Sequence, residues 1–269
     1  MQRLLFSHGQ WLAGALIILL FGCTSEPEVS ISRPLPNDGE GYSARRGVRL
    51  GTGGHYGTAV SAQVAVPVTA GSSLPRKSPS ALYSEVRVRK DYMPRNARGR
   101  RDSRSMRPRY ITIHSTQNWG RGADAWRHSL ALKRGKLGRL SWHYTVDEKV
   151  AVQHLPTNVT GNHADYDGPG NRYSIGIEMC EHPGNSRSVT VDRAAKLSAY
   201  LMCKYDIPLR RVVPHYHWPR WGRNPPNKNC PHFLLDHGRP GRKWRGFLAK
   251  VRRYHDEITK PSAETWASR

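Results

Sequence analysis

The sequence contains few acidic residues. Asp and Glu together number 20 among 269 residues, against 43 Lys and Arg, so the formal net charge is +23 at pH 7. Such a surplus of positive charge attracts polyanions, for example nucleic acid, anionic lipid or a cell-wall polymer, and carries no information about fold. At this length the chain has room for one or two domains with a real hydrophobic core.

Long apolar runs are also scarce. The run Trp11–Phe21 is too short to cross a bilayer as a helix, which disfavours a transmembrane anchor. With Arg3 before it and Gly22 after it, the run has the pattern of a targeting segment. The tetrapeptide LFGC resembles a bacterial lipobox, which implies a signal peptide over residues 1–22 and acyl chains on Cys23 that hold the protein on a membrane. The alternative is an ordinary secretory signal, and with either signal we expect the mature chain in the cell envelope, facing the periplasm or the cell exterior.

Residues 23–82 show no lasting helical or strand period and are rich in Ser, Pro, Gly and Thr. Such a segment buries too little apolar surface to offset the entropy of ordering, so we expect a flexible linker. No repeat at a solenoid period is present. A basic leader follows, to about residue 108, which would bind a polyanion or simply lie in solvent. It lacks interleaved aromatic side chains, which argues against binding of single-stranded nucleic acid.

Residues 83–258 alternate between strand and helix patterns, and a tail follows over residues 259–269. Strands are expected over residues 110–113, 141–146, 150–154, 174–180 and 212–214. Helices are expected over residues 122–134, 191–205 and 242–258. The residues Asp147-Glu148-Lys149 between the second and third strands are a hairpin signal. The pattern predicts an α/β fold, a single domain with a central mixed sheet flanked by helices.

Two histidines and a cysteine have the chemistry of zinc ligands. His215 follows a short apolar strand in VVPHYHW, His114 ends another in RYITIHST, and Cys230 lies in KNCPH. A catalytic zinc keeps three ligands of these types and leaves a fourth position for water. Each residue alone is more simply a strand cap or a buried thiol, whereas the set predicts a zinc site. His217 is the alternative to His215, but alternation would point it to the opposite face of an extended segment.

A single carboxylate, Glu178, interrupts the apolar strand SIGIEMC. An unpaired carboxylate would be costly there, and perturbed carboxylates cluster at functional sites. We therefore favour a general base, which takes a proton from water and delivers it to a leaving amine, over a salt bridge to one of the many arginines. Lys228, two residues before Cys230, would stabilise the oxyanion on an attacked carbonyl, although alone it would more often be a surface charge.

Seven motifs occur in a specific order between residues 92 and 235: IHST, SWHYTVDEK, VAVQHLP, NHA, GPGNRYSIGIEMCE, VVPHYHW and KNCPHFLL. This order resembles the zinc-dependent N-acetylmuramoyl-L-alanine amidases of the type-2 family, especially the Bacillus and phage lysin branch, which is related to peptidoglycan recognition proteins. The resemblance implies cleavage of the amide between N-acetylmuramic acid and L-alanine in peptidoglycan or muropeptides. It also implies that His114, His215 and Cys230 bind zinc and that Glu178 and Lys228 are catalytic.

Two features depart from the family pattern. Trp142 occupies the position where some relatives carry a catalytic Tyr, so that role is not transferred, and the loop before Cys230 is longer, with WPRWGRNPPN inserted. We expect substrate contacts from Trp142, Asn162 and His163, with His143 facing away from the site if Trp142 faces it. The alternatives are core packing for Trp142 and plain polar surface for His163.

Several alternatives stay open. Cys180 and Cys203 would pair in an oxidising compartment or remain two buried thiols, which the sequence does not decide. A non-catalytic peptidoglycan-binding module on the same fold would be favoured if Cys230 or Glu178 were missing. A nuclease typically needs carboxylate-bound magnesium or paired metals, which makes nucleic acid the weaker partner. We therefore expect a monomeric enzyme with zinc as its cofactor.

Overall fold

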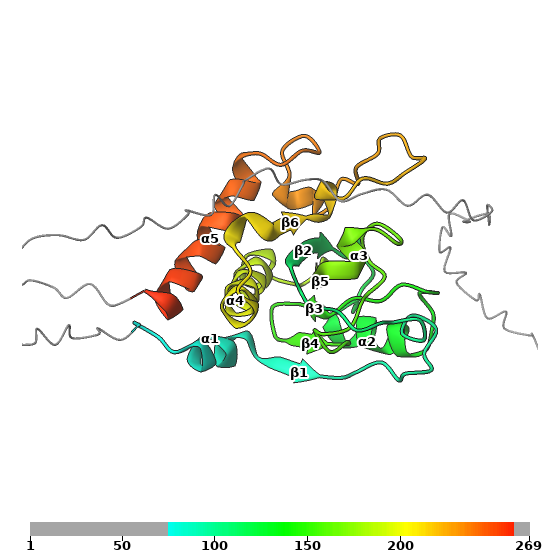
Figure 1. Ribbon diagram of the computed structural model, residues 1–269, viewed down its shortest axis with the longest axis horizontal. Coiled ribbons are helices and arrows are strands. Elements are labelled where there is room, and N and C mark those ends of the chain that lie inside the picture. Colours follow the sequence, from blue (N-terminus) through cyan, green and yellow to red (C-terminus); the bar gives the residue numbers. More distant parts are fainter. Residues whose placement is uncertain (1–74, 261–269) are drawn as a thin grey trace, which may run out of the picture. The chain divides into compact units, whose positions relative to one another are not determined.

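The computed structural model describes residues 75–260 (Figure 1). The expected signal peptide, the lipidation at Cys23, the expected linker up to residue 74 and the tail beyond residue 260 lie outside this range. Between residues 75 and 260, no helix combines the length and the apolar character that crossing a bilayer requires.

A six-stranded sheet forms the centre of the fold, in the order β1-β4-β3-β5-β2-β6. Its strands are β1 (Val88–Lys90), β2 (Tyr110–Ser115), β3 (Tyr144–Val146), β4 (Ala151–Gln153), β5 (Ser174–Met179) and β6 (Val212–Pro214). The hairpin pair β3 and β4 is antiparallel, and all other neighbours are parallel. The expected α/β fold with a central mixed sheet is therefore confirmed.

Helices cover both faces of the sheet (Figure 1). On one side α4 (Arg187–Tyr205) packs against α1 (Pro79–Val86) and α5 (Arg242–Thr259). On the other side α2 (Ala125–Lys133) contacts β3 and β4, and the short α3 (Pro169–Tyr173) leads directly into β5. Three single 3₁₀ turns complete the described elements, η1 (Leu209–Arg211), η2 (His215–His217) and η3 (His232–Leu234).

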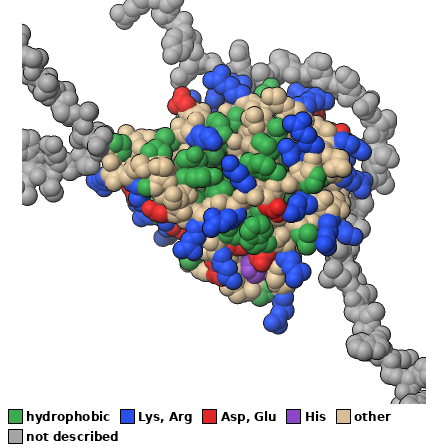
Figure 2. Space-filling model, turned by 90° about the horizontal axis from the view of Figure 1, so that it is seen from below, with side chains coloured by type: hydrophobic (Ala, Val, Ile, Leu, Met, Phe, Trp, Pro, Cys, Tyr) green, Lys and Arg blue, Asp and Glu red, His purple; other side chains and the backbone are tan. Residues whose placement is uncertain are grey.

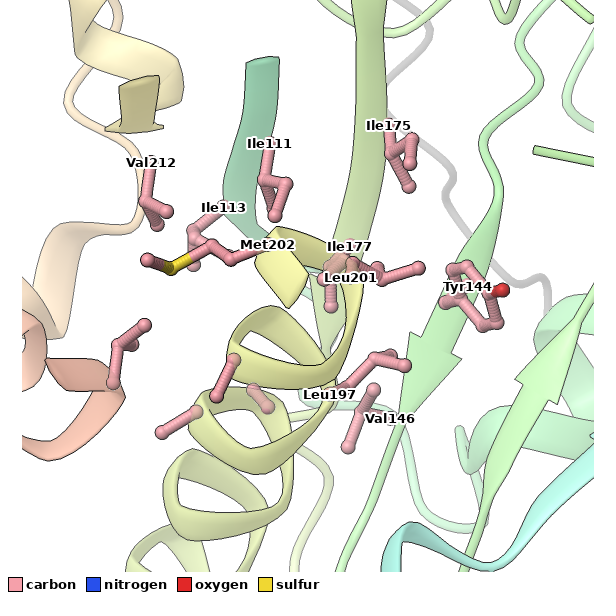
Figure 3. Close-up of a cluster of buried hydrophobic side chains, with 14 of the residues drawn as sticks. Ile111, Ile113, Tyr144, Val146, Ile175, Ile177, Leu197, Leu201, Met202 and Val212 are labelled. Atoms are coloured by element: carbon pink, nitrogen blue, oxygen red, sulfur yellow. The ribbon is translucent and has the colours of Figure 1, made fainter. Parts of the chain in front are cut away.

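Alternation along the two central strands separates an apolar face from a polar face. The apolar residues pack between the sheet and α4, where Figure 3 labels Ile111, Ile113, Ile175, Ile177, Leu197, Leu201 and Met202. The residues that alternate with these isoleucines are polar or small and lie on the opposite face: Thr112 and His114 on β2, and Gly176 and Glu178 on β5. Because β2 and β5 pair in parallel, His114 lies opposite Glu178. The polar face therefore carries two of the expected site residues side by side.

The chain between residues 75 and 109 belongs to the folded domain. Helix α1 begins at Pro79, within the stretch expected to be linker, and Ser78 caps it by accepting a hydrogen bond from the Ala81 N–H at 3.1 Å. Leu82 on α1 is fully buried, and so is Met93 in the basic leader. Helix α1, strand β1 and helix α3 were not expected from the sequence, because each is too short for its periodicity to stand out.

Positive charge is spread over the surface of the domain and is not confined to the leader. Figure 2 shows Lys and Arg side chains over the whole face in view, with few Asp or Glu among them. Helix α5 buries an apolar stripe that includes Trp244, Phe247 and Val251, and it exposes cations on its outer side. These exposed cations are Arg242, Lys243, Arg245, Lys250, Arg252 and Arg253.

Cys180 and Cys203 are both free thiols in the structure. Cys180 is buried in a small cluster with Ala125 and Val152, and Cys203 lies half-buried on α4. Of the two possibilities that the sequence left open, the structure has the separate thiols.

Candidate active site

His114, His215 and Cys230 come from three separate segments and meet at the carboxyl ends of β2 and β6. One ligand atom of each residue lies within 4.8 Å of the other two, and all three side chains are buried. Strand pairing explains the approach of the histidines, because Ile113 lies opposite Pro214. The residue after Ile113 is His114, still on β2, and the residue after Pro214 is His215, the first of η2. The carboxyl ends of parallel strands are the usual ligand-binding edge of an open α/β sheet.

Backbone hydrogen bonds hold the cysteine at this edge. The N–H of Ser115, the last residue of β2, donates to the Cys230 sulfur at 3.3 Å. The N–H of Tyr216 in turn donates to the Cys230 carbonyl at 3.0 Å. Cys230 is therefore tied both to the end of β2 and to the turn that carries His215.

The hydrogen bonds of the histidines define their tautomers. His215 Nε2 lies 3.0 Å from the Ala164 carbonyl, which can only accept, so Nε2 carries the hydrogen and Nδ1 keeps its lone pair. His163 Nε2 likewise donates to the Ser174 carbonyl at 3.3 Å, which leaves His163 Nδ1 as an acceptor. That atom lies 3.1 Å from His114 Nε2, so His114 donates there and its own Nδ1 also keeps a lone pair.

These tautomers make the three residues fit a zinc ion. The Nδ1 atoms of His114 and His215 face each other at 2.9 Å, and two lone pairs at that distance repel unless they share a cation or a proton. Two neutral imidazoles and a cysteine sulfur are a donor set that zinc favours. Burial lowers the pKa of His114 well below its usual value and that of His215 to about 3, so both rings are in the neutral, metal-binding form at pH 7. Burial raises the pKa of the Cys230 thiol to about 12, so binding of a metal would release its proton.

Glu178 supplies a carboxyl group beside the ligands. Its Oε1 lies 3.8 Å from His114 Nδ1, and its buried Oε2 has no hydrogen-bond partner among residues 75–260. Burial raises the pKa of Glu178 to about 7, while the charge of Lys228 acts in the opposite direction. A carboxyl that titrates near neutral pH can both accept and return a proton, as a general acid–base requires.

Lys228 places a positive charge next to the same groups. Its side chain is half-buried, and its backbone carbonyl accepts the N–H of Cys230 at 2.8 Å. The charge contributes to lowering the pKa of His114 and of His215. The structure therefore brings together the five residues that the sequence suggested for metal binding and catalysis.

Trp142 lies apart from this group, among hydrophobic side chains. Its side chain is 6% exposed and packs in a second hydrophobic cluster that includes Met93, Leu132 and Leu155. Its Nε1 donates to Thr145 Oγ1 at 2.7 Å. Core packing, the alternative for this residue, is what the structure shows.

His143 lies beside His163, so the condition under which it was expected to face away, a Trp142 that faces the site, does not apply. Its ring centre lies 5.9 Å from that of His163, and its Nδ1 accepts the N–H of Gly176 at 3.0 Å. Strand β3 begins only at Tyr144, so regular alternation does not reach residues 142 and 143 and could not assign their directions.

The other two residues expected to contact substrate differ in their surroundings. Asn162 is half-buried, with its amide oxygen accepting from Asn171 Nδ2 at 2.9 Å and its Nδ2 donating to the Arg139 carbonyl at 3.2 Å. His163 is buried and bonded to His114, so it is neither plain polar surface nor open to a large substrate. A substrate contact from Asn162 stays a prediction.

A further set of polar residues adjoins the cysteine and was not expected. His232 lies between Ser115 Oγ, at 3.3 Å from Nδ1, and Glu181 Oε2, at 3.2 Å from Nε2. The other oxygen of Glu181 accepts the N–H of Gln117 at 2.9 Å. Both Glu181 and His232 lie inside quoted motifs, MCE and CPH. Each stands two residues after the end of a strand or after an expected ligand, where no periodic pattern marks it.

Three comparisons with known proteins identify the family to which this fold belongs. Residues 104–233 match the family model described as N-acetylmuramoyl-L-alanine amidase. The chain is 41% identical over 165 residues to the N-acetylmuramoyl-L-alanine amidase CwlH of Bacillus subtilis, a match that covers 61% of this chain and 60% of CwlH. It is 41% identical over 167 residues to the amidase XlyA of the same organism, which covers 62% of this chain and 51% of XlyA. The chain therefore spans less than two thirds of the length of these relatives.

Two solved structures are matched over almost their whole length. A mutant endolysin from Bacillus subtilis is 40% identical with a TM-score of 0.54, and the match covers 61% of this chain and 97% of that one. The catalytic domain of XlyA is 39% identical with a TM-score of 0.53, and the match covers 61% of this chain and 98% of that domain. On these likenesses in sequence and structure, the chain belongs to the Amidase_2 family, the type-2 N-acetylmuramoyl-L-alanine amidases.

Proposed function

We propose that the folded domain within residues 75–260 hydrolyses the amide bond between N-acetylmuramic acid and L-alanine in peptidoglycan or muropeptides, with zinc as its cofactor. The observation that supports the proposal best is the meeting of two imidazole lone pairs and a thiol beside a carboxyl whose pKa is about 7. Family membership supports the substrate class, because CwlH and XlyA are both named as N-acetylmuramoyl-L-alanine amidases.

His114, His215 and Cys230 would hold the zinc ion. Zinc bound there would act as a Lewis acid on the amide carbonyl and lower the pKa of a water molecule to about 7. The protein's own side chains, Glu178 on β5 and Lys228 in the loop before Cys230, would supply the proton transfer and the positive charge.

Glu178 would move the proton. Its Oε2 has no hydrogen-bond partner among the described residues, so it is free to take a proton from the attacking water as the carbon–oxygen bond forms. The carboxyl group then gives this proton to the amide nitrogen as the carbon–nitrogen bond breaks, and the carboxylate is restored. A pKa of about 7 makes both directions accessible at neutral pH.

Lys228 would stabilise the negative charge that develops on the carbonyl oxygen. Its ammonium lies near enough to both histidines to lower their pKa values. A fixed positive charge in a partly buried site is worth more than the same charge in water.

We further propose that this domain acts in the bacterial cell envelope as a monomer held on a membrane through a lipid anchor at Cys23. The support is the LFGC pattern after an apolar run that is too short to span a bilayer. The positive face of the domain would favour contact with anionic lipid headgroups or wall polymer (Figure 2).

Purified sacculi give the direct test. The protein is incubated with sacculi, with a chelator, and with chelator followed by added zinc, and the release of stem peptides with a free L-alanine amino group is measured. We expect release that chelation abolishes and zinc restores. A non-catalytic binding module would sediment with the sacculi and release nothing, and a nuclease would degrade DNA in a parallel incubation.

A further inference from the structure

We propose that His163 is a positioning residue for the metal site: it fixes His114 as the tautomer with hydrogen on Nε2 and so directs the Nδ1 lone pair of His114 at the metal. This inference rests on the proposed function for the identity of the metal, but the tautomer itself is a property of the protein alone.

Two consecutive hydrogen bonds, from His163 to Ser174 and from His114 to His163, determine the tautomer of His114. The Ser174 carbonyl can only accept, so His163 Nε2 must donate to it, at 3.3 Å. The His163 ring is buried and has no carboxylate among its hydrogen-bond partners in the described residues, so nothing beside it would stabilise a positive charge. In a neutral ring with its hydrogen on Nε2, Nδ1 can only accept. His114 Nε2, 3.1 Å away, must then be the donor. Each step leaves the next residue one choice of tautomer.

The two histidine ligands are oriented by different means. His215 donates to the backbone carbonyl of Ala164, which no side-chain substitution can remove. Among the hydrogen bonds of residues 75–260, His114 Nε2 has His163 Nδ1 as its sole partner. The tautomer of His114 therefore depends on one side chain, and that dependence can be tested by mutation.

Two glycines, Gly161 and Gly176, leave the space that the His163 ring occupies. A Cβ on Gly176 would lie 2.9 Å from Cγ and Nδ1 of His163, and a Cβ on Gly161 would lie 2.9 Å from its Cδ2. Glycine weakens the interior of a strand and there often marks a close approach by another group. Gly176 lies in the middle of β5, between Ile175 and Ile177, and the His163 ring is the group that approaches it.

The backbone at His163 is also fixed. Asn171 Oδ1 accepts the N–H of His163 at 2.8 Å and that of Ala164 at 2.7 Å. The same residue donates from Nδ2 to Asn162 Oδ1 at 2.9 Å. One asparagine on α3 therefore holds the segment that presents both the His163 ring and the Ala164 carbonyl, which are the partners of the two histidine ligands.

Two amide substitutions separate the role of Nδ1 from that of Nε2. In His163→Asn the amide oxygen can occupy the place of Nδ1 and still accept from His114. In His163→Gln the amide reaches the place of Nε2, which keeps a donor for Ser174 but leaves His114 Nε2 without its acceptor. The two variants are both polar and similar in size, so they make a matched pair.

The readouts are the tautomer of His114 in the metal-free protein, from two-bond nitrogen–proton NMR correlations, and the dissociation constant for zinc, from competition with a chelator. We expect wild type and His163→Asn to keep the hydrogen on Nε2 of His114, and His163→Gln to lose that preference. Zinc affinity should fall about 10–100-fold in His163→Gln and stay within about threefold of wild type in His163→Asn.

The inference is overturned if His163→Gln keeps both the tautomer and the zinc affinity of wild type, or if both variants lose them equally. Neither readout uses substrate. If the tautomer and affinity follow the expected pattern while sacculi stay intact, the proposed amidase activity fails and the role of His163 stands. If sacculi are cleaved and His163→Gln behaves as wild type, the proposed amidase activity stands and the role of His163 fails.

Discussion

Glu178 lies directly opposite His114 in the register of the parallel strands β5 and β2, with Oε1 3.8 Å from the imidazole Nδ1. The distance between the carboxyl and the proposed metal ligand is therefore set by backbone pairing between two neighbouring strands and not by a loop. A slip of one residue would present Ile177 or Met179 to the site and move the carboxyl to the α4 face. Elements of this kind hold catalytic groups more closely than loops do.

Replacing Glu178 by Gln should abolish proton transfer and leave the metal in place. The side chain keeps its size, and none of the three expected ligands is touched. We expect release of peptides from sacculi to fall by about 10²–10⁴-fold, the usual contribution of a general acid–base. Zinc content, measured by atomic emission on the purified variant, should equal that of wild type.

The matched control is Asp167→Asn, which makes the same chemical change at an exposed carboxylate paired with Arg172 at 2.6 Å. Its activity should be unchanged. Full activity in Glu178→Gln would show that another group moves the proton.

Replacing Cys230 by Ser should remove the metal itself. A neutral hydroxyl is a poor substitute for a thiolate ligand, and the hydrogen bond from the Ser115 N–H would remain without an ion to complete the site. We expect loss of both zinc and activity. Cys203→Ser, at a half-buried thiol on α4 outside the site, should keep both. Full zinc occupancy in Cys230→Ser would overturn the assignment of this ligand.

Zinc should stabilise the native state, because the three ligand atoms converge only when β2, β6 and the loop before Cys230 are all in place. At a free zinc concentration 100 times the dissociation constant, the free energy of unfolding should rise by about 2.7 kcal/mol. Thermal unfolding in chelator and in buffered zinc measures this gain. Cys230→Ser should show no gain, and an equal shift in that variant would place the stabilising metal elsewhere.

The sequence predicted those site residues that stand at the ends of periodic strands. His114 and Glu178 follow the alternating isoleucines of β2 and β5, and His215 follows the apolar residues of β6, so each had a strand to define its place. To predict that the three segments converge, one must also know that β5, β2 and β6 lie side by side and parallel. The pattern of a single strand does not contain this order. Family resemblance supplied that link.

The surroundings of a residue were hardest to predict where local periodicity stops. Trp142 and His143 precede a strand of three residues, so alternation could not say which of them faces the ligands. His163 lies between strands, and its role depends on the Ser174 carbonyl and on space left by Gly161 and Gly176. Contacts of this kind are set by the path of a loop over a finished sheet, which the sequence pattern does not describe.

Trp142→Ala tests the reassignment of this residue from substrate contact to core. Removing the indole from the cluster with Met93, Leu132 and Leu155 should lower the free energy of unfolding by about 3–5 kcal/mol. Trp142→Phe keeps most of the ring and loses the hydrogen bond to Thr145, so it should cost about 1 kcal/mol. In Trp142→Phe, the Michaelis constant for soluble muropeptide should match wild type. A large rise in that constant at unchanged stability would restore the substrate contact.

Two buried histidines outside the ligand set make stability fall in acid. Burial lowers the pKa of His143 to about 4 and that of His154 to about 3, from a usual value of 6.5. Between pH 6.5 and the lowered pKa of each histidine, the unfolded chain binds more protons than the native one. The contribution to stability is therefore fully present above pH 6.5 and is lost as the pH falls below it. Each histidine should contribute a slope of about 1.4 kcal/mol per pH unit in this window.

His154→Gln isolates one of these slopes. The charges that act on His154 besides burial come from His128, Asp91, His143 and Lys133, and the substitution leaves all four in place. A glutamine can keep the contact that His154 Nε2 makes with Thr145 Oγ1 at 2.8 Å.

Urea unfolding of both metal-free proteins is compared between pH 6 and 4.5. The contributions of the proposed ligand histidines cancel in this comparison, because they are common to both proteins. The slope of the free energy of unfolding against pH should be smaller in the variant by about one proton, or 1.4 kcal/mol per pH unit. Equal slopes would mean that His154 is charged in the folded protein, and its burial beside a hydroxyl and an indole would then need another explanation.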